Sequence, residues 1–282
     1  MLTVTDHRRD YSGFRYVYPV VSRRAGGVSV GINLNPNNAC NWACVYCQVP
    51  DLTRGGPPPI DLALLETELA TLLRDIVQGD FMAKEVPEDA RHLMDVAFSG
   101  NGEPTSAPEF PDAVARISRL MQDLQLPETV KLRLITNGSL LHRAGVREGI
   151  RRIGNYGGEN AAGEVWFKID RATSDGIAAV NKIAYSPQKA HANLIACAEL
   201  APTWIQTCWF ALDGAAPDEQ EQAAYLALLD SVRTKIKGVH LYGLARPSLQ
   251  PEASRLGRLS IEQLAAFAAR IAALGIEVSL NP

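Results

Sequence analysis

The stretch SVGINLNPNNACNWACVYC, residues 29–47, joins a strand pattern directly to a group of three cysteines. In its first seven residues, Val30, Ile32 and Leu34 alternate with small or polar residues, which is typical of a β-strand with one apolar face. The cysteines then follow with three and two residues between them. A strand that runs into clustered cysteines predicts a metal centre at the end of that strand.

Short strand patterns and amphipathic helical patterns alternate along the rest of the chain. Repeated strand–helix–strand units predict parallel strands joined by right-handed crossovers. The expected strands are residues 29–35, 95–100, 131–136, 164–170, 204–210, 238–244 and 276–280. The expected helices are residues 61–77, 109–124, 140–152, 188–200, 217–235 and 260–274.

Such a sheet either stays open and doubly wound or closes into a TIM-like barrel, complete or partial. The segment EVWFKID, residues 164–170, favours the barrel, because Phe167 and Ile169 face one way and Lys168 and Asp170 the other. A central strand of a doubly wound sheet is covered by helices on both faces and is apolar on both. A strand with one polar face fits a barrel whose interior holds a polar ligand.

Length and composition indicate one globular unit. The 282 residues are 46% hydrophobic and 21% charged, so we expect an N-terminal extension over residues 1–28 and a barrel over 29–282 that includes a C-terminal strand. The net charge of −3 gives no basic field for nucleic acid, which stays a less favoured partner. The chain has no apolar run long enough to cross a membrane and an odd number of cysteines, so we expect no membrane partner and a cytoplasmic location.

The three clustered cysteines, Cys40, Cys44 and Cys47, favour an iron–sulfur cluster. Three thiolates can hold three irons of a [4Fe–4S] cubane and leave the fourth iron without a protein ligand. A zinc site needs a fourth Cys or His at short spacing, and the nearest histidines lie far away in the sequence. A ferredoxin-like cluster needs a fourth cysteine, for which only Cys197 and Cys208 remain. Buried structural cysteines are the remaining and least favoured interpretation.

The CxxxCxxC spacing after the first strand, with Tyr46 before the third cysteine, resembles the radical S-adenosylmethionine (SAM) superfamily. The resemblance extends from about Ser29 to Leu244 and implies a partial (β/α)6 barrel with its active site at the carboxyl ends of the strands. It also implies that SAM binds the open iron and is cleaved reductively to a 5′-deoxyadenosyl radical, which abstracts hydrogen from a substrate. A reductant such as flavodoxin or ferredoxin then supplies the electron.

The segment SGNGEPT, residues 99–105, follows the second expected strand and starts with Ser99. Gly102, Glu103 and Pro104 match the superfamily motif whose backbone and carboxylate receive the amino group of SAM. Glycine permits a close approach of the backbone, and proline removes a donor where the strand ends. Without the cysteines, the same residues would be read as an ordinary turn.

Residues at the ends of three further strands are expected to contact SAM through the same resemblance. Thr136 and Asn137 belong to a TNG motif, in which Asn137 bonds the ribose or the methionine carboxylate. Asp170 or Ser174 holds the ribose hydroxyls, and the backbone near Leu244 reads the adenine.

Two inward-facing residues are candidates for binding the substrate or reacting with it. Lys168 is expected to meet a carboxylate of SAM or substrate, and it forms a Schiff base in a weaker alternative. Cys208 could donate a hydrogen atom to a substrate radical, whereas a small core residue is the alternative. An ion pair of Lys168 with Asp170 that serves structure alone also stays open.

The substrate itself is not named by the sequence. Segments including FSGNGEPT, FKID and LYGLARPS are loosely similar to a bacterial branch near the tRNA wybutosine base-forming enzymes. The polar barrel interior favours a small-molecule substrate. An RNA nucleotide, a glycyl-radical protein, and a non-catalytic iron–sulfur protein for electron transfer are the alternatives.

Overall fold

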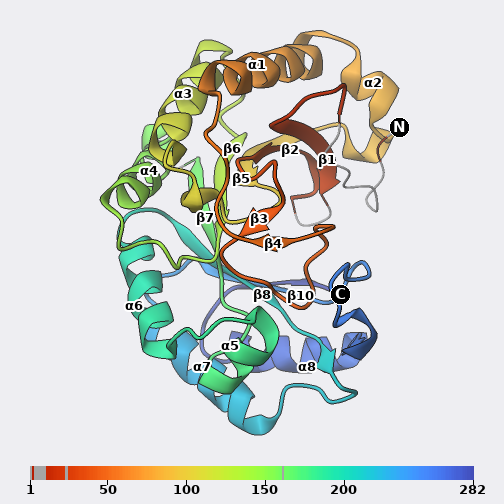
Figure 1. The fold of residues 1–282 in the computed structure, drawn as a ribbon, viewed down its shortest axis with the longest axis vertical. Coiled ribbons are helices and arrows are strands. Elements are labelled where there is room, and N and C mark those ends of the chain that lie inside the picture. Colours follow the sequence, from red (N-terminus) through yellow and green to blue (C-terminus); the bar gives the residue numbers. More distant parts are fainter. Residues whose placement is uncertain (1, 3–10, 23–24, 161) are drawn as a thin grey trace.

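The computed structural model describes residue 2 and residues 11–22, 25–160 and 162–282. One sheet of eight strands curls into an open barrel, and the helices lie in an arc along its outer face (Figure 1). The strand order is β1 (Val17–Ser22), β2 (Gly27–Asn33), β5 (Leu93–Ser99), β6 (Lys131–Thr136), β7 (Gly163–Lys168), β8 (Thr203–Cys208), β10 (Gly238–Tyr242) and β12 (Val278–Asn281).

Within this sheet, neighbouring strands are parallel except for β1, which runs antiparallel to β2. Within the described residues β1 and β12 are the two edges of the sheet, so the barrel stays open between them. The prediction of a partial TIM-like barrel is therefore confirmed, and all seven expected strands are present within a few residues. The eighth strand, β1, lies inside the expected N-terminal extension, with Pro19 on an edge strand, where proline is tolerated.

The helices alternate with the strands, as the sequence predicts. The expected six are α1 (Leu62–Gln78), α3 (Phe110–Asp123), α4 (Ala144–Gly154), α6 (Pro187–Ala198), α7 (Glu219–Val232) and α8 (Ile261–Ala272). Two shorter helices, α2 (Phe81–Glu85) and α5 (Ser174–Asn181), were not predicted, because neither is long enough to show a clear apolar period. None of the described helices has the length and apolar character needed to cross a membrane.

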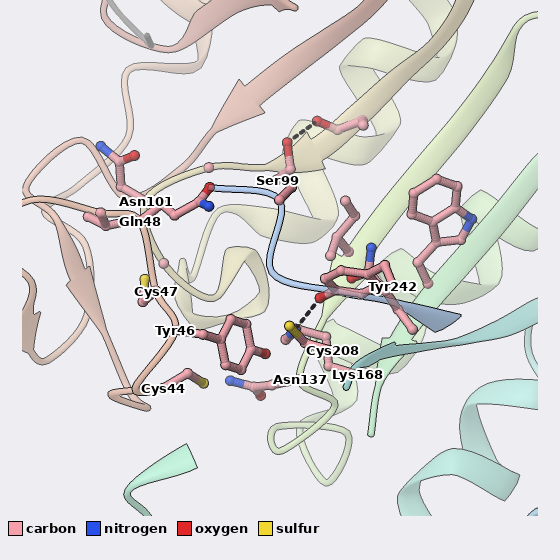
Figure 2. A pocket seen from close by; sticks show the side chains of 18 of the residues that line it. Cys44, Tyr46, Cys47, Gln48, Ser99, Asn101, Asn137, Lys168, Cys208 and Tyr242 are labelled. Carbon is pink, nitrogen blue, oxygen red and sulfur yellow. Dashed lines mark hydrogen bonds between the residues drawn. The ribbon is translucent and has the colours of Figure 1, made fainter. Parts of the chain in front are cut away.

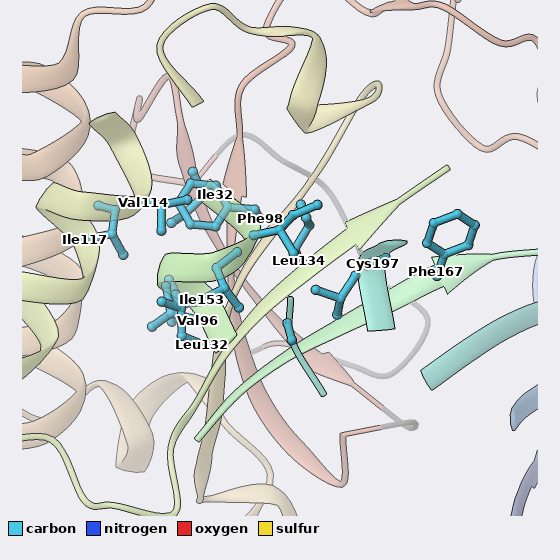
Figure 3. Packing of buried hydrophobic residues seen from close by; sticks show 14 of the residues in the cluster. Ile32, Val96, Phe98, Val114, Ile117, Leu132, Leu134, Ile153, Phe167 and Cys197 are labelled. Atoms are coloured by element: carbon cyan, nitrogen blue, oxygen red, sulfur yellow. The ribbon is translucent and has the colours of Figure 1, made fainter. Parts of the chain in front are cut away.

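The core lies between the outer face of the sheet and the helices, as Figure 3 shows. Apolar side chains of β5 and β6 meet those of α3 and α4 there, and full burial of each contributes about 1.5–3 kcal/mol. Cys197 of α6 belongs to this core and is fully buried. The members that show the packing best are Ile32, Val96, Phe98, Val114, Ile117, Leu132, Leu134, Ile153 and Phe167.

The inner face of the sheet is polar, and β1 helps to fill it. Tyr18 of β1 pairs with Gly31 of β2, and a Cβ atom at Gly31 would lie 2.2 Å from the tyrosine ring. The missing side chain at Gly31 therefore makes room for the ring. The Tyr18 hydroxyl reaches the hydroxyl of Ser99 at 2.9 Å, so β1 contributes directly to the interior.

Candidate active site

A cavity of about 340 Å³ lies inside the barrel against the cysteine loop, which we define as residues 40–47. Figure 2 shows side chains from this loop and from the strand ends that point into it. Active sites of barrel enzymes lie at the carboxyl ends of the strands, which is the edge where these residues meet. The interior is therefore accessible from the side that carries the cysteines.

The cysteine loop is held from two sides by hydrogen bonds. The backbone N–H of Val45 donates to the carbonyl of Val180 at 2.9 Å, and that of Ala43 donates to the carbonyl of Asn181 at 3.3 Å. From the other side, the hydroxyl of Ser248 donates to the carbonyl of Val45 at 2.7 Å. The end of α5 and the segment after β10 together fix the path of the loop, which positions its cysteines.

All three loop cysteines are partly exposed free thiols that line the cavity. Burial raises the pKa of Cys40 to about 11 and that of Cys44 to about 12. Both thiols are therefore protonated near neutral pH in the protein without metal. Because metals bind thiolates, loading this site would release protons.

The donor chemistry of the loop, three thiols, suits an iron–sulfur cluster. Among the described residues, no three His, Cys, Asp or Glu side chains lie close enough together to hold one metal ion. The three loop thiols are separate soft ligands, each of which can take its own iron of a cubane. Cys40, Cys44 and Cys47 are thus the residues that could hold a [4Fe–4S] cluster.

Asp170, just after β7, connects the cysteine loop to the barrel. Its Oδ2 accepts hydrogen bonds from the Tyr46 hydroxyl at 2.6 Å and from the Asn181 amide at 2.9 Å, while its Oδ1 accepts from the backbone N–H of Cys208 at 3.0 Å. The carboxylate is only 2% exposed. Burial raises the pKa of Tyr46 well above its ordinary value, so its hydroxyl remains the donor.

Lys168 lies between Asp170 and two aromatic rings, and Figure 2 shows it beside Tyr242. Its Nζ is 3.7 Å from the Asp170 carboxylate, 4.9 Å from the centre of the Tyr46 ring and 3.3 Å from the Tyr242 hydroxyl. Burial alone would lower the pKa of Lys168, but the Asp170 carboxylate, followed by Tyr242, raises it above its ordinary value. The side chain is therefore cationic at neutral pH.

Glu103 has its carboxylate in a cradle of donors. Its Oε1 accepts from both hydroxyls of Thr105 and Thr136 at 2.6 Å, and its Oε2 accepts from the backbone N–H of Asn137 at 2.7 Å. Burial raises its pKa. Oε2 accepts only one of these hydrogen bonds, so it can accept a second one from a donor in the cavity.

Asn137 and Gly102 tie the cysteine loop to the neighbouring strand ends. The Asn137 amide donates to the side-chain oxygen of Asn41 at 2.9 Å, and Asn41 in turn donates to the hydroxyl of Ser139 at 2.8 Å. A Cβ atom at Gly102 would lie 2.1 Å from the carbonyl oxygen of Ala39, so only glycine permits this approach.

The structure brings most of the expected site residues to one cavity. Those that line it are Cys40, Cys44, Tyr46, Cys47, Ser99, Gly102, Glu103, Asn137, Lys168, Cys208 and Leu244. Pro104, Thr136, Asp170 and Ser174 are not among its lining residues. The Thr136 hydroxyl donates a hydrogen bond to Glu103, and Asp170 accepts one from the Tyr46 hydroxyl. Ser174 is the first residue of α5.

Several cavity residues were not predicted as site residues. Gln206 and Tyr242 lie on the inner faces of β8 and β10, where the strand alternation could have indicated them. Arg133 of β6 pairs with Asp95 and also with Glu164, 2.5 Å from its Nε. No local signal marks this ion-pair group, since its members come from three different strands.

Comparisons with known proteins give partial sequence matches. No known family model matches the chain. A protein of Brachyspira hyodysenteriae named GTPase Obg is 27% identical over 132 residues, which are 46% of this chain and 16% of that protein. The UPF0026 protein slr1464 of Synechocystis is 28% identical over 171 residues, which are 60% of this chain and 53% of that protein. The chain thus spans about half or less of the length of these relatives.

Solved structures are similar over most of the chain. A radical SAM methyltransferase from Sphaerobacter thermophilus has a TM-score of 0.60 and 17% identity, covering 90% of this chain and 66% of its own. TYW1 with a bound lysine–pyruvate adduct has a TM-score of 0.58 and 14% identity, covering 88% and 74%. The enzyme anSMEcpe with bound AdoMet has a TM-score of 0.51 and 15% identity, covering 89% and 62%. The chain therefore has the fold of radical SAM enzymes.

Proposed function

We propose that the chain is a radical SAM enzyme that holds one [4Fe–4S] cluster on Cys40, Cys44 and Cys47. The observation that carries this proposal is that the three cysteines face the same cavity as Glu103 and Lys168, at the carboxyl-end mouth of a barrel with the radical SAM fold. A protein that only carried electrons would not need a polar chamber behind its cluster.

When bound, the cluster and SAM supply reductive cleavage of the sulfonium to methionine and a 5′-deoxyadenosyl radical, which abstracts hydrogen from the substrate. The protein residues prepare the site for this chemistry. The cysteines ligate three irons as thiolates, and Asp170 and Asn181 hold the loop through Tyr46 and Cys44.

The proposed SAM-binding site is formed by the strand ends that surround the cysteine loop. The free capacity of Glu103 Oε2 suits the amino group of SAM, because a carboxylate and an ammonium form a charge-assisted bond. Asn137 and Leu244 line other parts of the cavity wall. Asn137 would bind the ribose or the methionine carboxylate of SAM, and the backbone near Leu244 would bind the adenine. Asp170 and Ser174 would contact the ribose only after a rearrangement, since neither lines the cavity.

The substrate is best described as a small molecule, since the cavity of about 340 Å³ lies inside the barrel and has polar and charged side chains among apolar ones. TYW1, a structure of similar fold, holds a lysine–pyruvate adduct. A Schiff base requires a neutral amine, whereas the raised pKa keeps Lys168 protonated. Lys168 is therefore better suited to bind a charged group than to attack a carbonyl. Cys208 remains the candidate hydrogen-atom donor.

An electron donor such as flavodoxin or ferredoxin would reduce the cluster. The odd number of cysteines, three of them in one loop, favours a reducing compartment, for which we propose the cytoplasm. Residues 29–282 form the catalytic barrel in this proposal, and β1 adds a wall to it.

The proposal is tested by SAM cleavage. The protein is reconstituted anaerobically with iron and sulfide, reduced with dithionite and mixed with SAM, and products are identified by mass spectrometry. Methionine and 5′-deoxyadenosine are expected from the wild type and from Cys197→Ala, whose cysteine lies in the core, but not from Cys44→Ala. A cluster-loaded protein that does not cleave SAM, or that yields methylthioadenosine, would contradict the proposal.

A further inference from the structure

The side-chain amide nitrogen of Gln206, on β8, is buried and has no hydrogen-bond acceptor among the described residues. The residue is 2% exposed and lines the cavity. A buried donor left without an acceptor costs about 1–3 kcal/mol. A bound ligand with an oxygen acceptor at this point would remove that cost.

Lys168 is the neighbour of Gln206 across the sheet. The two residues pair in register between the parallel strands β7 and β8, and both line the cavity. Backbones of adjacent strands lie about 4.8 Å apart, so the two side chains leave the sheet side by side. A cationic donor and a neutral donor thus enter the same part of the chamber.

The charge of Lys168 is only partly compensated by hydrogen bonds. Its Nζ lies 3.7 Å from Asp170, beyond hydrogen-bond distance, and it donates a hydrogen bond to the Tyr242 hydroxyl at 3.3 Å. The Asp170 carboxylate already accepts bonds from Tyr46, Asn181 and the backbone of Cys208. An ammonium has three donors, so capacity remains for an anion from the cavity.

A second cation of the cavity wall, on β6, is in a different situation. Arg133 pairs with two carboxylates, those of Asp95 and Glu164, and stacks on Trp166 with its guanidinium carbon 4.5 Å from the ring centre. Two acidic groups against one guanidinium give that part of the wall a net negative charge, which repels an anion. Of the two cations on the barrel strands, Lys168 is therefore the better partner for an anionic group.

We propose that Lys168 and Gln206 bind a carboxylate of the substrate, with one oxygen near each donor. This inference rests on the proposed function, since it assigns the substrate of the same cavity to the small carboxylic acids. The pair lies two residues before Asp170 and Cys208 along the strands, and Lys168 Nζ is 4.9 Å from the centre of the Tyr46 ring in the cysteine loop. The remainder of the substrate would then lie beside Cys208, which lines the same cavity.

The test compares two probes of nearly equal shape, propionate and propionamide. Their binding to the reconstituted protein, with the cluster oxidised and SAM present, is measured by saturation-transfer difference NMR. Propionate is expected to bind at least tenfold more tightly than propionamide. Lys168→Met and Gln206→Leu are each expected to weaken propionate at least tenfold, because each removes one of the two donors.

The control variants carry the same two replacements at exposed positions, namely Lys237→Met and Gln188→Leu. Neither is expected to change propionate binding. Because Lys168→Met leaves Asp170 without its cation, Gln206→Glu provides a second variant, whose carboxylate repels the probe and should abolish its binding. Circular dichroism of each variant verifies that the protein is folded.

Each alternative outcome decides a different point. Equal binding of propionamide, or full binding by Gln206→Glu, would overturn the carboxylate site. Loss of propionate binding on addition of SAM would also overturn it, since the pair would then serve the SAM carboxylate. Selective propionate binding by a wild type that does not cleave SAM would contradict the proposed function alone, and SAM cleavage without selective binding would contradict the carboxylate site alone.

Discussion

The side-chain amide nitrogen of Asn181 lies 3.3 Å from the sulfur of Cys44 and donates to Asp170 at 2.9 Å. Asn181 is 2% exposed and is the last residue of α5. One amide group therefore links the cysteine loop, the end of β7 and a helix that the sequence did not predict. Hydrogen bonds to the sulfurs are among the features that set the potential of an iron–sulfur cluster.

Substitution of Asn181 is expected to make the cluster harder to reduce. Asn181→Ala removes the N–H···S bond, which stabilises the more negative, reduced cluster, so the reduction potential should fall by on the order of tens of millivolts. An EPR-monitored redox titration of the reconstituted protein measures this shift. Asn160→Ala, on the exposed surface, is the matched control, and an equal potential in both variants would contradict the role of Asn181.

Asp170→Asn is expected to destabilise the fold strongly. The substitution leaves the partly buried Lys168 ammonium without its counter-charge, which costs up to about 3–5 kcal/mol in the free energy of unfolding. Asp213→Asn breaks the exposed pair with Arg255 and should cost at most about 1 kcal/mol. Urea denaturation of both variants provides the comparison. Similar losses in the two variants would show that the buried pair has no special weight.

The thiols of the apo-protein should react slowly at pH 8. With the pKa of Cys40 raised by burial from 9.0 to about 11, its thiolate population is about 100-fold lower than in an unshifted thiol. Iodoacetamide labelling of Cys40, followed by peptide mass spectrometry, is therefore expected to be slower in the native protein than in urea by that order. Equal rates in both conditions would contradict the shift.

The same shifts have a consequence for stability. Both folded-state pKa values, about 11 for Cys40 and about 12 for Cys44, lie above the unfolded value of 9.0. The contribution of these thiols to stability is therefore complete below pH 9 and is lost as pH rises through 11 and 12. The free energy of unfolding of the apo-protein should fall across this range, and Cys40→Ala should reduce the fall.

Gly31→Ala is expected to disturb the wall formed by β1. Its Cβ would lie 2.2 Å from the ring of Tyr18, and such overpacking typically costs about 1–3 kcal/mol. Gly56→Ala is the control, because no atom lies within 4 Å of its added methyl group, so a change within about 0.5 kcal/mol is expected. Thermal unfolding of the two variants measures the difference, and equal melting temperatures would be inconsistent with the packing described.

Strand alternation predicted the parts of the site that depend on local order. In residues 164–170 it placed Lys168 on the polar face, and Lys168 lines the cavity. Cys208 of β8 was also expected to face inward, and it lines the same cavity. Spacing alone identified the three cysteines, which face that cavity.

Features that depend on long-range contacts could not be read from the sequence. Tyr46 and Asp170 are 124 positions apart, and Cys44 and Asn181 are 137 apart, so no local pattern connects them. Strand β1 lies in the expected extension, because its sequence VYPVVS shows no alternation of apolar and polar residues, and in the structure it is buried almost throughout. Which side of β1 faces the barrel interior is determined by its antiparallel pairing with β2.

With three cysteines as ligands, we propose that one iron of the cluster stays open for SAM in this cavity. The most direct measurement is electron–nuclear double resonance on the reduced, reconstituted protein with SAM labelled with ¹⁵N at its amino group. We predict a hyperfine coupling from the labelled nitrogen in the wild type and in Cys197→Ala. A reduced [4Fe–4S] cluster that shows no coupling from bound SAM would contradict the claim.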